Sequence, residues 1–155
     1  MLEGTFNSHP PVGGKNETLK YLHNKFPEMS GAKADNDDTA LTIACQFAGV
    51  ETVKMMIEDF KLDVHQIGYQ GRNCFLSAAE AGKNETLTYL HNNFPELVKT
   101  EDDFGETALT FICKWAPVST VKLCIDQFKI NVFEKNMHGK NAFDVAIRSG
   151  NTEVQ

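Results

Sequence analysis

The sequence contains no run of eighteen apolar residues, which excludes a membrane-spanning helix within these 155 residues. Its first six residues, Met1 to Phe6, lack the basic and then apolar layout of a secretory signal peptide. Basic residues are outnumbered, since 15 Lys and Arg face 21 Asp and Glu, and the formal net charge is −6. A negative chain disfavours binding to nucleic-acid phosphates. We therefore expect an intracellular protein, cytoplasmic or nuclear, that binds neither membranes nor nucleic acids.

Cysteine is sparse, and no two cysteines form a CxxC pair. The four cysteines are Cys45, Cys74, Cys113 and Cys124. Cys45 and Cys113 occupy the same position in the repeat described below. A repeated position indicates a repeated packing environment, so we expect small buried thiols and no disulfide framework.

Sequence motifs of catalysis and metal binding are also missing. The chain has no GxSxG, no HExxH and no Walker-type loop, because Gly13-Gly14-Lys15 lacks the leading glycine and the following Ser or Thr. His23 and His91 have no further ligands at the spacing of a zinc site. We therefore expect a protein that is not an enzyme and that holds no cofactor or metal.

What the sequence does contain is a repeat. The segment Gly14–Glu28 returns as Gly82–Glu96 with 13 of 15 positions identical, and Gly71, Gly105 and Gly139 are evenly spaced. The glycines define a period of about 34 residues, typical of a solenoid in which each unit buries its apolar face against its neighbours. We predict one domain over residues 1–155, built of units at residues 3–36, 37–70, 71–104, 105–138 and 139–155, the last of them partial.

Each complete unit contains two segments with apolar residues at helical spacing. The first segments lie at residues 39–45, 73–79 and 107–113. A turn follows, marked in the three units by Gly49, Gly82 and Pro117. The second segments carry apolar side chains over residues 53–60, 87–94 and 121–128.

Asn16 and Asn84 precede a second segment in equivalent units, where an N-cap residue belongs. Both also begin an Asn-Glu-Thr sequence, which is formally an acceptor for N-glycosylation. Because no secretion signal is visible, we favour the capping role. Pro27 and Pro95 cannot continue a helix and predict where it ends.

The openings Thr39-Ala-Leu-Thr42 and Thr107-Ala-Leu-Thr110 resemble the Thr-Pro-Leu-His motif of the ankyrin repeat. The likeness extends from about Gly14 to Val154. Proline is absent from these motifs, and the units are duplicated in pairs. The first unit also departs from the pattern, since Ser8-His-Pro-Pro-Val12 would break its opening helix.

The resemblance implies an all-α fold, an ankyrin-type helix-turn-helix solenoid with projecting finger loops. It also implies a non-catalytic module that binds a protein partner on a concave face of fingers and first helices. We expect such a chain to be a monomer. Two alternatives remain open from the sequence: a structural segment of a longer array, and a regulatory or targeting appendage of a larger protein.

By position in the family, the fingers and the ends of the first helices are exposed on this face. The early fingers carry solvated acidic runs at Asp35–Asp38 and Glu101–Asp103, while Lys135, Lys140 and Arg148 make the last unit basic. A partner with the opposite charge gradient would gain orientation and association rate. The candidate protein-binding residues are Phe47, Tyr69, Arg72, Phe104, Glu106, Lys114, Trp115, His138 and Lys140.

Phe47 and Trp115 occupy one repeat position, and Trp115 is the only tryptophan of the chain. A large aromatic side chain at this position either packs against the preceding finger or is exposed as an anchor for a partner. Aromatic residues dominate binding hot spots, as the second interpretation requires. The sequence alone leaves both open.

Overall fold

The computed structural model describes residues 14–150. The predicted break at Ser8–Val12 lies outside these residues. The chain divides into two compact units, residues 1–32 and 33–155, and each is described by itself. The single domain expected over residues 1–155 stays a prediction.

In the first unit, helix α2 spans Gly14–Lys25 and the short helix α3 spans Pro27–Ser30. Pro27 occupies the first turn of α3, where its missing N–H costs nothing. The predicted end of the helix at Pro27 is therefore confirmed. His23 Nδ1 lies 2.8 Å from Ser30 Oγ and ties the two helices together.

Over residues 33–150, the second unit consists of three antiparallel helix pairs and a final helix. The pairs are α4 (Ala40–Phe47) with α5 (Val50–Glu58), α6 (Cys74–Glu80) with α7 (Asn84–Asn93), and α8 (Ala108–Trp115) with α9 (Val118–Asp126). Two 3₁₀ turns, η1 (Tyr69–Gly71) and η2 (Pro95–Val98), and the last helix, α10 (Ala142–Ser149), complete it. Residues 14–150 contain no β-strand beyond two isolated bridges, so the all-α class is confirmed.

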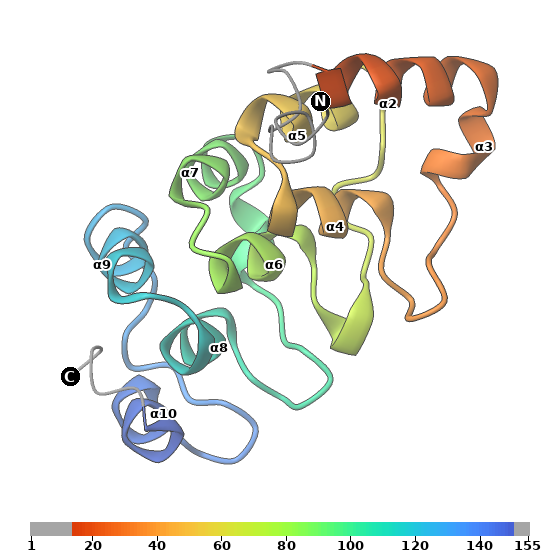
Figure 1. The fold of residues 1–155 in the computed structure, drawn as a ribbon. Coiled ribbons are helices and arrows are strands. Elements are labelled where there is room, and N and C mark those ends of the chain that lie inside the picture. The colour runs from red at the N-terminus through yellow and green to blue at the C-terminus, as the bar shows by residue number, and fades with distance from the viewer. Residues whose placement is uncertain (1–13, 151–155) are drawn as a thin grey trace, which may run out of the picture. The chain divides into compact units, whose positions relative to one another are not determined.

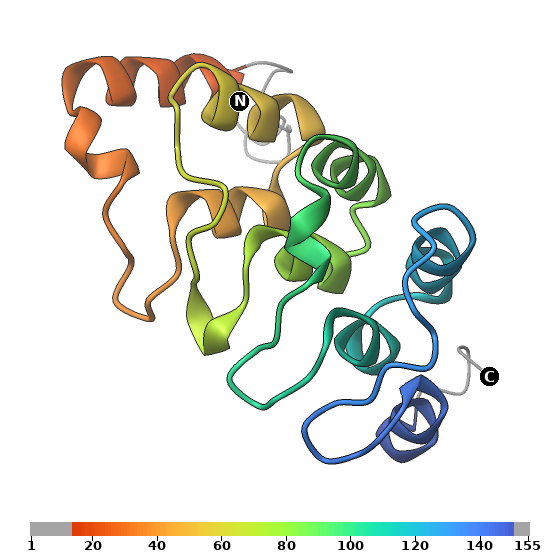
Figure 2. The same ribbon diagram turned by 180° about the vertical axis from the view of Figure 1, so that it is seen from behind.

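The helices of this unit form two layers, and loops project from them (Figures 1 and 2). The first helices α4, α6, α8 and α10 pack side by side. Each of the first three also packs against its own second helix, α5, α7 or α9. The loops that join one pair to the next project away from the second helices, as the fingers of the predicted solenoid should.

Capping boxes start the first helices α4, α8 and α10. Thr39 Oγ1 accepts a hydrogen bond from Thr42 N, and the Thr42 side chain accepts one from Thr39 N. Thr107 and Thr110 repeat this arrangement two units later. Such caps satisfy backbone donors that the helix leaves unpaired and contribute about 1 kcal/mol each. The repeated Thr-x-x-Thr spacing is thus the signal that starts α4 and α8.

The core lies between the two helix layers and between neighbouring units. Phe75, Leu109 and Phe111 of the first helices are fully buried, as are Leu87 and Leu90 of α7. Burial of a Leu or Phe side chain is worth about 1.5–3 kcal/mol, and each unit obtains it from its neighbours. Most apolar positions predicted for these two layers are buried, whereas Ile43 is exposed and Phe60, Phe94 and Ile125 are half-buried.

All four fingers have the same backbone turn. In each finger, an amide N–H donates to the carbonyl oxygen four residues later, at 2.8–3.1 Å, and the third residue after the donor has φ between +73° and +78°. This left-handed conformation suits glycine best, which explains the even spacing of the finger glycines. The left-handed residues are Asp37, Gly71, Gly105 and Gly139.

The predicted N-cap roles of Asn16 and Asn84 are wrong. Helix α2 begins at Gly14, so Asn16 lies inside it, and α7 begins at Asn84 itself, after Lys83. Gly82, with φ +70°, turns the chain early enough for Asn84 to be helical. The Asn84 Oδ1 instead accepts a hydrogen bond of 2.7 Å from Thr120 Oγ1 of the next unit.

All four cysteines are free and buried, as predicted. Burial raises the pKa of the Cys113 thiol to about 11 and, with Cys113 nearby, that of the Cys124 thiol to about 12. The pKa of Cys45 is also raised, first by its hydrogen bond with Cys74 and then by burial. These thiols are packing groups.

Candidate functional site

The candidate site is the face of residues 33–150 formed by the fingers and the first helices. Its fingers are held in place by their neighbours. Asp103 N donates to Gln70 O at 3.0 Å, and Met137 N donates to Gly105 O at 3.0 Å, so backbone bonds join successive fingers. A Cβ atom on Gly105 would collide with the Met137 side chain, which shows how close the fingers approach. The face is therefore preorganised.

The four aromatic residues predicted for this face are exposed. Phe47 ends α4 and is 74% exposed, and Trp115 ends α8 and is 49% exposed. On the fingers, Tyr69 is 44% exposed and Phe104 is 53% exposed. The alternative in which Phe47 and Trp115 are covered by the preceding finger is thus wrong. Lys114 Nζ lies 5.5 Å from the centroid of the Trp115 ring, a cation–π distance.

A charged pair links each of two fingers to its own first helix. Arg72 Nη1 lies 2.8 Å from Glu80 Oε1, and the Arg72 guanidinium lies 5.0 Å from the centroid of the Phe111 ring. One repeat later, Lys114 Nζ lies 3.5 Å from Glu106 Oε2. The two pairs occupy equivalent positions of successive units, with the charges exchanged.

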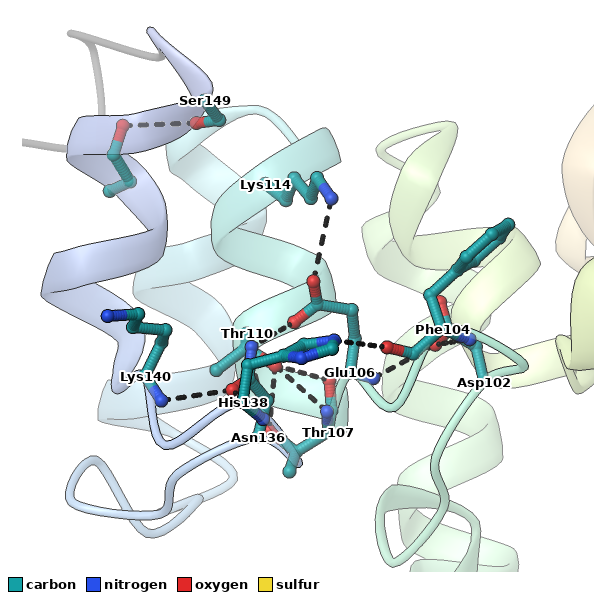
Figure 3. Close-up of polar contacts among 11 residues, drawn as sticks. Asp102, Phe104, Glu106, Thr107, Thr110, Lys114, Asn136, His138, Lys140 and Ser149 are labelled. Atoms are coloured by element: carbon teal, nitrogen blue, oxygen red, sulfur yellow. Dashed lines mark hydrogen bonds and ion pairs between the residues drawn. The ribbon is translucent and has the colours of Figure 1, made fainter.

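The expectation that Glu106 is exposed is wrong, because this side chain is buried. Its Oε1 accepts a hydrogen bond of 2.9 Å from Asn136 Nδ2, while Lys114 contacts the other oxygen (Figure 3). The following finger thus covers the carboxylate. Arg72 is half-buried for a similar reason, since Glu80 and Phe111 hold it.

The acidic runs are also more structural than predicted. Asp102 is buried, and its Oδ1 accepts hydrogen bonds of 2.9 Å from the amides of Phe104 and Glu106. Asp38 is half-buried and accepts a hydrogen bond of 3.1 Å from Tyr69 N. These carboxylates hold finger turns, whereas Asp103 is exposed as expected.

The last finger is organised by Asn136, which sequence reasoning missed. Asn136 Oδ1 accepts hydrogen bonds from the amides of His138 at 2.9 Å and Lys140 at 3.0 Å. The exposed His138 ring points back to the preceding finger, with Nε2 3.2 Å from Phe104 O (Figure 3). The only signal for Asn136 in the sequence is its position one period after Asp102, which accepts equivalent bonds.

Lys140 is half-buried, and Arg148, on α10, is exposed. Both line a cavity of about 310 Å³, together with Glu106, Lys114 and His138. Arg148 was assigned to the basic end of the face but was not among the candidate binding residues, although it lies beside several of them.

Residues 14–150 offer no group of three or more His, Cys, Asp or Glu side chains that could hold a metal ion. Over the same residues, no helix combines the length and apolar character needed to span a bilayer. The site consists of exposed aromatic side chains and charged groups, an arrangement suited to binding.

The comparison with known families agrees with this architecture. A family model described as ankyrin repeats, in three copies, matches residues 75–154, just over half of the chain. The match runs from α6 through α10 and therefore includes the last two helix pairs and the fingers that follow them. Ankyrin repeats generally mediate protein–protein interaction and are typically not enzymes. The chain belongs to the ankyrin repeat family.

Proposed function

We propose that this chain is a non-catalytic module that binds a protein partner through the fingers and first helices of residues 33–150. The observation that carries the proposal is the exposure of Phe47, Tyr69, Phe104 and Trp115 on this scaffold. Large aromatic side chains left in water bury much apolar area when a partner covers them, and they dominate binding hot spots.

The scaffold supports the proposal because it is ordered before binding. Backbone hydrogen bonds join the fingers at Gln70–Asp103 and Gly105–Met137. Binding to such a surface loses little conformational entropy, so more of the contact energy remains as affinity. Specificity then depends on side chains that differ between units, such as Phe104.

The proposal covers the whole chain as one ankyrin domain with the five predicted units. We propose a monomer located in the cytoplasm or nucleus. Size-exclusion chromatography with light scattering tests the first point, and imaging of the tagged full-length protein tests the second. A mass of twice 17.3 kDa would contradict the monomer.

The test of binding is affinity capture from the source cell followed by mass spectrometry. The double variant Phe104→Ala/Trp115→Ala should lose at least ~90% of the captured partner, because loss of a hot-spot residue costs about 2 kcal/mol or more. Its melting temperature should stay within a few degrees of the parent. The matched control is Phe133→Ala, which removes a phenylalanine that is 83% exposed but lies outside the candidate residues.

Two outcomes would contradict the proposal. If Phe133→Ala lowers capture as much as the double variant, the candidate aromatic residues have no special role. If no protein is captured by any version of the chain, a structural segment becomes the better interpretation.

A further inference from the structure

The positions that join a finger to the end of its first helix recur in successive units, but their charges change along the chain. They hold Arg72 with Glu80, and then Glu106 with Lys114. In the last unit these positions hold Lys140 and Arg148, so both residues are cations where the two preceding units have one acid and one base.

These two cations have no acidic partner among residues 14–150. No ion pair or hydrogen bond joins the side chain of Lys140 or Arg148 to any residue in that range, and the bond between Lys140 and the Asn136 side chain uses the Lys140 backbone amide. Glu106 is the one described carboxylate that lines their cavity, and Asn136 and Lys114 already occupy its two oxygens. The cavity therefore carries an excess of positive charge, in a chain whose net charge is −6.

We infer that this cavity binds an acidic segment of the partner protein, with Lys140 and Arg148 as the ligands of its carboxylates. This inference rests on the proposed function, since it assigns a chemistry to one end of the same face. A partner carboxylate beside Arg148 would restore the kind of contact that Arg72 and Glu80 make at 2.8 Å. Arginine is well suited to it, because its guanidinium binds a carboxylate through two parallel hydrogen bonds.

A carboxylate fits this position better than a phosphate because the scaffold itself supplies carboxylates there. At both preceding units the anion is a glutamate side chain, on the helix in one case and on the finger in the other. The cavity of about 310 Å³ is also part of a face with exposed aromatic residues, Phe104 and Trp115, which suits a peptide chain more than a free ion.

The inference is tested with the full-length chain and a short probe peptide. The ¹⁵N-labelled protein is titrated at low ionic strength, where charge interactions are screened least, with acetyl-Gly-Ala-Glu-Glu-Ala-Gly-amide. The matched peptides replace both glutamates by glutamine or by phosphoserine. We expect saturable amide shifts centred on Lys140 and Arg148 with the glutamate peptide, and at least about fivefold weaker binding of the glutamine peptide.

The decisive variant is Arg148→Glu, which places an acid opposite Lys140 as in the Arg72–Glu80 pair. It should melt at or above the temperature of the parent and bind the glutamate peptide at least about tenfold more weakly. Lys135→Glu is the matched control, because it makes the same change in net charge at an exposed residue outside the cavity. This control should change binding by less than about twofold.

Several results would overturn the inference. Equal binding of the glutamate and glutamine peptides would show that the site does not recognise carboxylates. Tighter binding of the phosphoserine peptide would show that its ligand is a phosphate. If Lys135→Glu and Arg148→Glu lose the same amount of affinity for the glutamate peptide, the effect comes from net charge alone. If no peptide causes amide shifts, the cavity is not a binding site. Because no captured partner is needed, these failures are separate from a failure of the proposed function, which the aromatic variants test.

Discussion

Glu106 Oε2 lies 3.5 Å from Lys114 Nζ, and the pair joins a finger to the helix behind it with the charges of Arg72 and Glu80 exchanged. The two members of the pair differ in burial. Glu106 is buried beneath Asn136, whereas the Lys114 side chain is partly exposed. Removal of Lys114 leaves the buried Glu106 carboxylate without its cation, whereas removal of Glu106 leaves a lysine that water can solvate.

We therefore predict unequal costs for the two truncations. Glu106→Ala should lower the free energy of unfolding by about 1–3 kcal/mol, because it also leaves the Asn136 amide without its acceptor. Lys114→Ala should lower it by about 3–5 kcal/mol, because it leaves the buried Glu106 carboxylate without its cation. Urea denaturation measures both values, and equal costs for the two variants would contradict the assigned burial.

The fingers offer a second matched comparison. Gly105 and Gly139 have almost the same φ, +78° and +76°, but only the Gly105 Cβ position is occupied, by Met137. Gly139→Ala should cost about 1–2 kcal/mol for the left-handed backbone alone. Gly105→Ala should cost at least about 1 kcal/mol more, because Met137 must move. Thermal and urea denaturation of both variants test this, and similar costs would mean that the fingers are not in close contact.

The cysteines should be unreactive in the folded chain. Thiolate is the reacting species, and a pKa of about 11 for Cys113 lowers its thiolate fraction near neutral pH about 100-fold relative to the usual value of 9.0. Burial of all four thiols slows access further. A chromogenic disulfide reagent should thus titrate four thiols in denaturant and almost none within minutes without it. Rapid modification of one thiol in the native chain would contradict this.

His65 links two units in a pH-dependent way. Its Nε2 lies 2.8 Å from Glu96 Oε2 and its Nδ1 lies 3.4 Å from Asp63 Oδ1. The hydrogen bond with Glu96, and then that with Asp63, raises the pKa of His65 above its usual 6.5. The pKa of Glu96 is lowered from 4.5, first by its own backbone amide and then by His65.

The two side chains stabilise the folded chain over different pH ranges. The His65 contribution to stability is complete below pH 6.5 and is lost as the pH rises through the raised pKa of the folded chain. The Glu96 contribution is present above pH 4.5 and is lost on acidification. His65→Gln should therefore lower the melting temperature most between these two values, and its effect should disappear as the pH rises through the raised pKa of His65. Since the side chains are exposed, the shift should be small and should shrink in high salt.

The sequence was sufficient to predict the helices inside each repeat, because local residues determine where they start and end. The Thr39 and Thr107 openings, the ends at Pro27 and Pro95 and the apolar spacing are local signals, and the structure confirms them. The left-handed residue of each finger was visible only as a glycine period, because Asp37 takes the same conformation without being glycine.

Contacts between units could not be predicted in the same way. Glu106 is buried because Asn136 lies over it, and the Asn84 side chain accepts a hydrogen bond from Thr120 of the next unit. These partners are 30 and 36 residues away, so no local pattern at Glu106 or Asn84 indicates them. The exposure of Phe47 and Trp115 could not be predicted either, because it also depends on neighbouring units.

The backbone bonds between successive fingers also set a rule for variation on this face. Asp103 and Gln70 are joined by main-chain atoms, and so are Met137 and Gly105, so their side chains are not needed for the connection. An insertion or deletion in one finger would displace its bonds to the fingers on both sides. Exposed side chains of the fingers, such as Phe104, can therefore vary while the length of each finger stays fixed, unlike ordinary surface loops, which tolerate both changes.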